Sequence, residues 1–240
     1  MSEPELSEDA MRYVSPAYYI DSDSMEVQAF VMGALRNISP DASKKDKAIR
    51  LFEAVRDDIR YDPYKFEMNT EAYRASMIAG MEATYCVPKA ILLTACLRAV
   101  GVPAAVGFAD VRNHLTTPKL LELMETDLFI NHGYVQLWLD NKPYKVTPAF
   151  NMDLCTRFGV KPLVFDGESD ALFHEFDMND QRHMEYVSDH GVHQDAPIED
   201  FLRTFKENYP KLDTFNNEGM TKRGAEGFDK GFAQSKGGET

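Results

Sequence analysis

Cys86 and His132 are the two residues of this chain whose types and surroundings could together perform chemistry. Cys86 stands where a helix should begin, with Pro88 in the first turn and Gly101 where that helix should end. A helix N-terminus offers unpaired N–H groups and the positive end of the helix dipole, both of which lower the pKa of a thiol. We therefore expect Cys86 to supply a nucleophilic thiolate.

His132 opens an alternating segment, residues 132–139, which predicts a strand. A cysteine at a helix start and a histidine on a strand are the parts of a thiol acyl-transfer site. The thiolate attacks an amide or ester carbonyl, and the imidazole takes and returns the proton. The oxyanion would be stabilised by the Cys86 N–H and by a donor from the preceding segment, such as Tyr85 or a nearby amide.

The elements that must position these residues follow from apolar spacing and breakers. Apolar positions at helical spacing predict helices over 25–37 and 43–60, a short helical pattern over 70–77, and the helix that begins at Cys86. The β-branched run 102–108 predicts a buried strand. Residues 140–143 supply a turn after the His132 strand, and 144–147 return as its partner.

The insert 109–131 is interpreted as a loop with one short helix over 118–125, placed to form a cleft wall or lid. Residues past 151 are expected to be irregular until a last helix that starts at Pro197 and ends near Tyr209. Within that stretch, Phe, Tyr and His residues favour a segment that folds over the cleft. The final thirty residues carry six Gly and few aliphatic residues, which predicts a disordered tail.

This order of elements resembles the core of the transglutaminase-like superfamily, whose fold is related to papain-type cysteine proteases, and the chain is similar to bacterial-type members. The matching segments are Lys47–Pro63, Cys86–Phe108 and His132–Pro148, so that the resemblance covers about residues 41–150. It implies an α+β fold in which N-terminal helices, one of them starting at the catalytic Cys86, pack on an antiparallel β-sheet that carries the catalytic His132.

The third catalytic position of the family is usually an aspartate in a Trp-x-x-x-Asp-Pro pattern. Here the corresponding run is Tyr144–Pro148, and Thr147 replaces the aspartate. A threonine hydroxyl can accept a hydrogen bond from the imidazole but supplies no charge. The resemblance also makes Asn151 a second candidate for orienting the histidine, because cysteine proteases of related fold tolerate an asparagine in this role. Symmetric pairing of the hairpin about 140–143 would place residue 151 opposite His132.

Four further residues are candidates for substrate binding. Tyr85 precedes the cysteine, and Trp138, the only tryptophan, lies at even spacing from His132 and so shares its face of the strand. Asp110 and Arg112 follow the buried strand closely. A cleft role for Trp138 competes with a role in the core, and Asp110 and Arg112 are equally compatible with a solvated loop.

Composition narrows the class of protein. A net charge of −13 argues against nucleic acid, because no basic face is available to replace counterions. No apolar run is long enough to span a bilayer, and the acidic N-terminus does not resemble a signal peptide. The three cysteines form no even framework, which fits free thiols and a cytoplasmic location. The oligomeric state is left open.

The sequence therefore predicts an arm and helix over 1–40, a transglutaminase-like domain over 41–210 with a C-terminal extension over 152–210, and a tail over 211–240. The leading hypothesis is a cysteine-dependent amide hydrolase or acyltransferase without a cofactor, whose substrate is a peptide, a protein or a small amide. Its rival is a catalytically lapsed module that binds peptides in the same groove, which is motivated by Thr147.

A third alternative is a metal-dependent hydrolase. It would use the segment from His183 to His193, with His174 and Asp189 nearby, as zinc ligands. The spacings match no standard zinc motif, so the sequence favours a site without metal.

Overall fold

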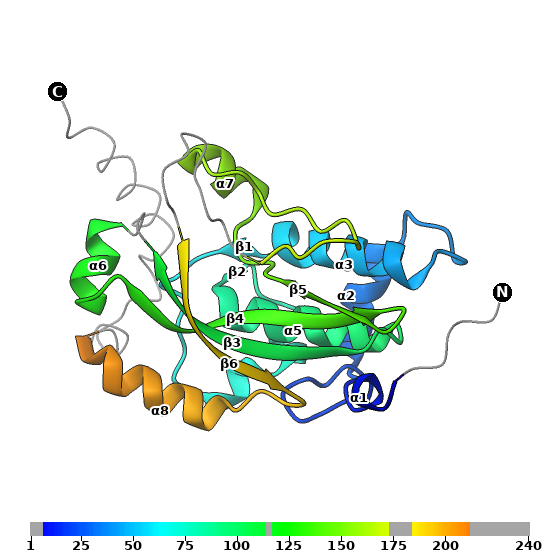
Figure 1. Ribbon diagram of the computed structural model, residues 1–240, viewed down its shortest axis with the longest axis horizontal. Helices are drawn as coiled ribbons and strands as arrows, with labels where there is room; N and C mark the ends of the chain where they lie inside the picture. The colour runs from blue at the N-terminus through cyan, green and yellow to red at the C-terminus, as the bar shows by residue number, and fades with distance from the viewer. Residues whose placement is uncertain (1–6, 114–116, 173–183, 212–240) are drawn as a thin grey trace.

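A computed structural model describes residues 7–113, 117–172 and 184–211. Its elements form an α+β fold in which a four-stranded antiparallel sheet, in the order β5-β4-β3-β6, packs on helices from the N-terminal half (Figure 1). This confirms the predicted fold class. The described elements are α1 (Glu8–Met11), α2 (Met25–Leu35), α3 (Lys44–Asp58), β1 (Arg60–Tyr61), η1 (Thr70–Tyr73), α4 (Ala75–Ile78), β2 (Ala83–Thr84), α5 (Cys86–Ala99), β3 (Ala104–Asn113), α6 (Pro118–Met124), β4 (Leu128–Leu139), β5 (Lys142–Val146), α7 (Met152–Phe158), β6 (Met184–His193) and α8 (Ile198–Asn208).

Helix α5 is the centre of the core. Every residue from Cys86 to Arg98 is buried, because the sheet covers one side of the helix and α2, α3 and α4 cover the other (Figure 1). Pro88 lies in its first turn, and Gly101 ends it with φ +73°, a left-handed conformation that glycine adopts without strain. The predicted boundaries of this helix are confirmed.

The sheet differs from the sequence expectation in its extent. Strand β3 continues to Asn113 and β4 begins at Leu128, so both ends of the insert 109–131 are strand and only the middle carries the predicted helix, α6. Residues 184–193, expected to fold over the cleft, instead form β6, which pairs with β3 at the edge of the sheet. Helix α7 was also missed, whereas α8 begins one residue after the predicted start.

The hairpin register corrects a prediction about Asn151. Leu139 pairs with Lys142, because Asp140 and Asn141 both adopt positive φ values, 50° and 62°, and form a two-residue turn. The pairing is therefore shifted by two residues from the symmetric arrangement assumed from sequence. Strand β5 also ends at Val146, before Asn151 could lie opposite His132.

A β-bulge in β4 directly precedes His132. Ala109 pairs with His132 and Val111 pairs with Phe129, so β4 carries one residue more than β3 across this interval. Asn131 has φ +53°, and its N–H donates to Oδ1 of Asp110 at 3.0 Å. The bulge is thus held by a side chain of the neighbouring strand, and it bends β4 where the candidate histidine begins.

Among the residues that the structure describes, no helix is long and apolar enough to cross a membrane. The structure describes the predicted arm from residue 7 onward. Within this arm, Tyr13 stacks on Trp138. The predicted disordered tail lies outside the described residues from 212 onward.

Candidate active site

Cys86 and His132 line the same cavity. Helix α5 presents Cys86 at its first residue, and β4 runs alongside that helix end, where the bulge at Asn131 leads into His132. The two side chains are almost fully buried, with 8% of Cys86 and 4% of His132 exposed. The enclosed space is small, about 50 Å³. The fold thus brings together the two residues on which the sequence hypothesis depends.

Gly133 is a site residue that the sequence reasoning missed. A Cβ atom at this position would lie 2.8 Å from Cα of Val87 and 3.2 Å from the carbonyl oxygen of Cys86. The backbone N–H of Gly133 lowers the pKa of the Cys86 thiol. Only a glycine allows β4 to approach the start of α5 so closely. A glycine inside a strand pattern is a known signal of close backbone approach, and it was present here.

The acidity of the Cys86 thiol differs from the sequence expectation. Burial raises its pKa to about 11, although hydrogen bonds from the N–H groups of Gly133, Val87 and Cys86 itself act in the opposite direction. The backbone N–H groups at the helix N-terminus therefore lower the pKa of Cys86 as expected, but burial of the thiolate raises it by more. In this closed arrangement the resting form is the thiol.

The two candidates for orienting His132 are both buried. Thr147 donates its N–H to the carbonyl of Ala171 at 2.8 Å, and its Oγ1 atom makes no hydrogen bond to any described residue. Asn151 precedes α7, and its Oδ1 accepts the N–H of Tyr61 at 3.1 Å. Tyr61 lines the Cys86 cavity, so Asn151 supports a wall of the cavity through this bond.

The four candidates for substrate binding lie in different places. Tyr85 lines the Cys86 cavity, and its hydroxyl hydrogen bonds to that of Tyr73 at 2.6 Å. Trp138 lies elsewhere, in a small cluster with Ala10 and Ala105 where Tyr13 stacks on it at 5.0 Å. The structure therefore places Trp138 in a packing role rather than at this cavity.

Asp110 and Arg112 also lie outside the described lining of the cavity. Arg112 forms a partly buried ion pair with Asp127 at 2.7 Å. Asp110 contacts the residue that precedes His132, because it accepts the N–H of Asn131. It also binds the hydroxyl of Ser188 and, at 2.8 Å, Nε2 of His190. Burial alone would raise the pKa of Asp110, but these hydrogen bonds outweigh it and the pKa is lowered.

Helix α8 and helix α6 close the cavity. Phe201, Phe205 and Tyr209 follow at intervals of four and so share one face of α8, which is turned toward Cys86. Phe205 stacks on Phe66 with 3.7 Å between ring centroids. The aromatic spacing was visible in the sequence, but nothing in it showed that this helix lies over the cysteine.

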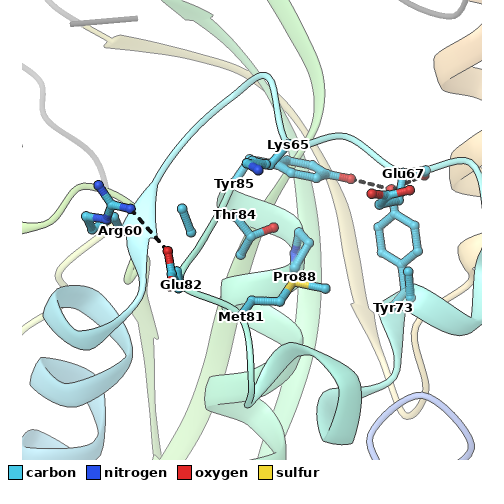
Figure 2. A pocket seen from close by; sticks show the side chains of 11 residues that line it. Arg60, Lys65, Glu67, Tyr73, Met81, Glu82, Thr84, Tyr85 and Pro88 are labelled. Carbon is cyan, nitrogen blue, oxygen red and sulfur yellow. Dashed lines mark hydrogen bonds and ion pairs between the residues drawn. The ribbon is translucent and has the colours of Figure 1, made fainter. Parts of the chain in front are cut away.

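A larger hollow adjoins the cavity on the other side of Tyr85. It has a volume of about 500 Å³ and lies between β1, β2 and the start of α5 (Figure 2). Arg60 and Glu82 pair across it at 3.7 Å, and Lys65 and Glu67 add further charges to its lining (Figure 2). Tyr85 lines both spaces and so separates the larger hollow, which carries charged side chains, from the apolar cavity of Cys86.

The histidine-rich segment does not assemble a metal site in the part of the chain that the structure describes, where no three His, Cys, Asp or Glu residues are grouped to hold an ion. His190 pairs with Asp110, and His193 packs on Phe108 at 5.7 Å. Asp189 binds Lys145 at 2.6 Å. His174 and His183 lie outside the described residues.

The fold and the cavity define a class, an α+β protein with a cysteine at the start of its central helix and a histidine on the strand beside it. The family model described as the transglutaminase-like superfamily matches residues 33–148. The match contains Cys86, His132 and Thr147, and ends before Asn151 and α8.

Among solved structures, the chain is similar to a protein of Cytophaga hutchinsonii described as "a Putative Cysteine Protease", with 15% sequence identity and a TM-score of 0.44. The alignment covers 79% of this chain and 55% of that chain, so this chain spans little more than half the length of that protein. No curated protein matches the chain.

Proposed function

We propose that this protein is a cysteine-dependent hydrolase or acyltransferase that acts on amide bonds of a peptide, a protein or a small amide. The observation that carries the proposal is the shared cavity of Cys86 and His132, where the backbone N–H of Gly133 lowers the pKa of the thiol. The match of residues 33–148 to the transglutaminase-like superfamily model supports it.

The proposed reaction has two steps. Sγ of Cys86 bonds to the carbonyl carbon as its proton passes to His132, and His132 then protonates the leaving amine as the C–N bond breaks. Water or a second amine attacks the thioester, which releases the acid or the new amide and restores the thiol. The backbone groups of Gly133, Val87 and Cys86 lower the pKa of the thiol, so they would stabilise the thiolate during attack.

In this scheme, the Cys86 thiol must lose its proton when the substrate binds. The pKa of about 11 keeps Cys86 protonated in the closed cavity. His132 therefore acts as a base during attack rather than as the partner of a permanent ion pair. We propose that Asn151 fixes the cavity wall through Tyr61. Oγ1 of Thr147 makes no hydrogen bond to a described residue here, so any orienting of His132 by Thr147 would arise during the reaction.

A specific observation also favours the alternative of a lapsed peptide-binding module. The closed cavity, the raised pKa of Cys86 and the replacement of the usual acid by Thr147 all reduce reactivity. Such a module would retain the groove and bind without turnover.

Trapping of the acyl-enzyme separates the two functions. The purified chain is mixed with 4-nitrophenyl butyrate, and the modified residue is located by peptide mass spectrometry. An enzyme acylates at Cys86 and then releases butyrate, or transfers it to added amine. A lapsed module shows no acylation of Cys86 above the rate of an unfolded control, which would remove the enzymatic proposal.

A further inference from the structure

The cavity beside Cys86 is lined by a nearly continuous apolar surface. Its wall contains four phenylalanines together with aliphatic and thioether side chains from α6, and among the described lining residues none is Asp, Glu, Lys or Arg. The phenylalanines come from three separate parts of the chain, and the principal members are Phe66, Leu120, Met124, Phe129, Phe201 and Phe205.

Two of the three tyrosines of the wall, Tyr85 and Tyr209, present rings rather than free hydroxyls. The hydroxyl of Tyr209 accepts the N–H of Ile130 at 2.8 Å and donates to the carbonyl of Leu128 at 2.7 Å. The hydroxyl of Tyr85 is engaged by that of Tyr73 (Figure 2). These bonds satisfy the polar tips within the protein, so both side chains offer apolar area to the cavity.

Such a wall discriminates by charge. An ionised group that entered the cavity would lose its hydration and gain no opposite charge, which is costly, whereas an apolar group gains about 25 cal/mol for each Å² removed from water. We propose that this cavity is the acyl-group site of the enzyme, and that it accepts an uncharged, apolar substituent on the carbonyl carbon that Cys86 attacks. This inference rests on the proposed function of Cys86 as nucleophile.

Helix α8 sets the size of that substituent. The space of about 50 Å³ exceeds the roughly 10–15 Å³ that a cavity needs to hold one water molecule, so a short chain fits beside the helix. Phe205 closes the cavity through its stack on Phe66. Helix α8 lies beyond residue 148, where the match to the superfamily model ends. The limit on the size of the substituent is therefore set by the C-terminal extension of this chain.

The test compares the rates at which 4-nitrophenyl esters acylate Cys86 in the full chain. Sγ displaces 4-nitrophenolate in each case, and each rate is divided by the rate of the same ester with glutathione, which removes intrinsic reactivity. The esters are the butyrate, the octanoate, the anionic hemisuccinate and the cationic 4-(trimethylammonio)butyrate. Because the chain has a net charge of −13, general attraction would favour the cation, whereas the apolar wall disfavours both ions.

We expect butyrate to exceed both charged esters by at least about tenfold after normalisation, since this corresponds to only about 1.4 kcal/mol. Phe205→Ala should raise the octanoate rate by about fivefold or more relative to butyrate, and Phe205→Leu by less. Leu202→Ala is the matched control, because Leu202 is buried on the same helix but is not part of the cavity wall. In Leu202→Ala, the ratio of the octanoate acylation rate to the butyrate acylation rate should stay at the wild-type value.

Two results would overturn the inference while leaving the proposed function intact. One is acylation of Cys86 with equal normalised rates for butyrate and for either charged ester. The other is the same ratio of octanoate to butyrate in Phe205→Ala, Leu202→Ala and wild type. If no ester acylates Cys86 at all, the proposed function is refuted and the inference falls with it.

Discussion

Gly133 lies directly against Cys86, because a Cβ atom at position 133 would lie 3.2 Å from the carbonyl oxygen of Cys86. This approach brings the strand residue that follows His132 against the first residue of the central helix. The distance between nucleophile and base is therefore set by direct backbone packing of β4 on α5, which any side chain at position 133 would disturb.

Gly133→Ala should damage the fold and the site together. The added Cβ would lie 2.8 Å from Cα of Val87, which is backbone and cannot move aside cheaply. We expect the free energy of unfolding to fall by about 1–3 kcal/mol, as in other overpacked cores, and the acylation rate of Cys86 to fall with it. Urea unfolding and ester acylation measure the two effects.

Gly33→Ala is the control for this substitution. Gly33 lies in α2, where a Cβ meets nothing within 4 Å, so alanine should raise the free energy of unfolding by about 0.5–1 kcal/mol through helix propensity. Equal stability of the Gly133→Ala and Gly33→Ala proteins would show that β4 does not need its close approach to α5.

Lys89 should make stability rise with pH above neutrality. It is fully buried, and Nζ donates to the carbonyls of Arg56 and Ile59 at 2.9 Å and 2.6 Å, at the end of α3. Burial lowers its pKa to about 7. The unfolded chain therefore binds one more proton than the folded chain between about pH 7 and pH 10, so stability increases across this window by at most about 1.4 kcal/mol per pH unit.

The measurement is the difference in free energy of unfolding between wild type and Lys89→Met at several pH values. The subtraction removes the contributions of the buried cysteines, whose raised pKa values act in the opposite direction. A difference that stays constant from pH 7 to pH 10 would mean that Lys89 keeps its ordinary pKa in the folded protein.

Thr147→Val separates the orienting role of Thr147 from a structural role. Oγ1 is buried and makes no hydrogen bond to any described residue, so a methyl group of the same shape should leave stability unchanged or raise it by about 1 kcal/mol. If the hydroxyl orients His132 during reaction, acylation of Cys86 should nevertheless slow by about tenfold. An unchanged acylation rate would show that the hydroxyl of Thr147 does not orient His132.

The sequence predicted those parts of the fold whose determinants are local. Helix α5 could be bounded from Pro88 and Gly101, and α8 from Pro197 and its apolar spacing, because breakers and periodicity lie within each segment. Strand β6 was missed because its edge position leaves polar residues such as Ser188 and Asp189 at both alternations. The register of the hairpin depended on two positive φ values that sequence spacing alone does not fix.

The candidate site was predicted only in part for a related reason. Cys86 and His132 carry their chemistry in their residue types, and the order of elements was enough to bring them together. The contributions of Asp110, Gly133 and Phe205 depend on which segments meet in space. The pKa of Cys86 was expected in the wrong direction because it depends on burial by α6 and α8, which no local motif encodes.

The most direct test of the central claim is the rate at which 4-nitrophenyl butyrate acylates Cys86 at neutral pH in wild type, His132→Ala and His193→Ala. His193 is the matched control, because it packs on Phe108 outside the described lining of the Cys86 cavity. If His132 is the base, its loss should slow acylation by about 10²–10⁴-fold, and the loss of His193 should change it by less than about twofold. Equal rates in His132→Ala and wild type, or acylation of Cys96 or Cys155 in place of Cys86, would contradict the assignment of Cys86 and His132 as the reacting pair.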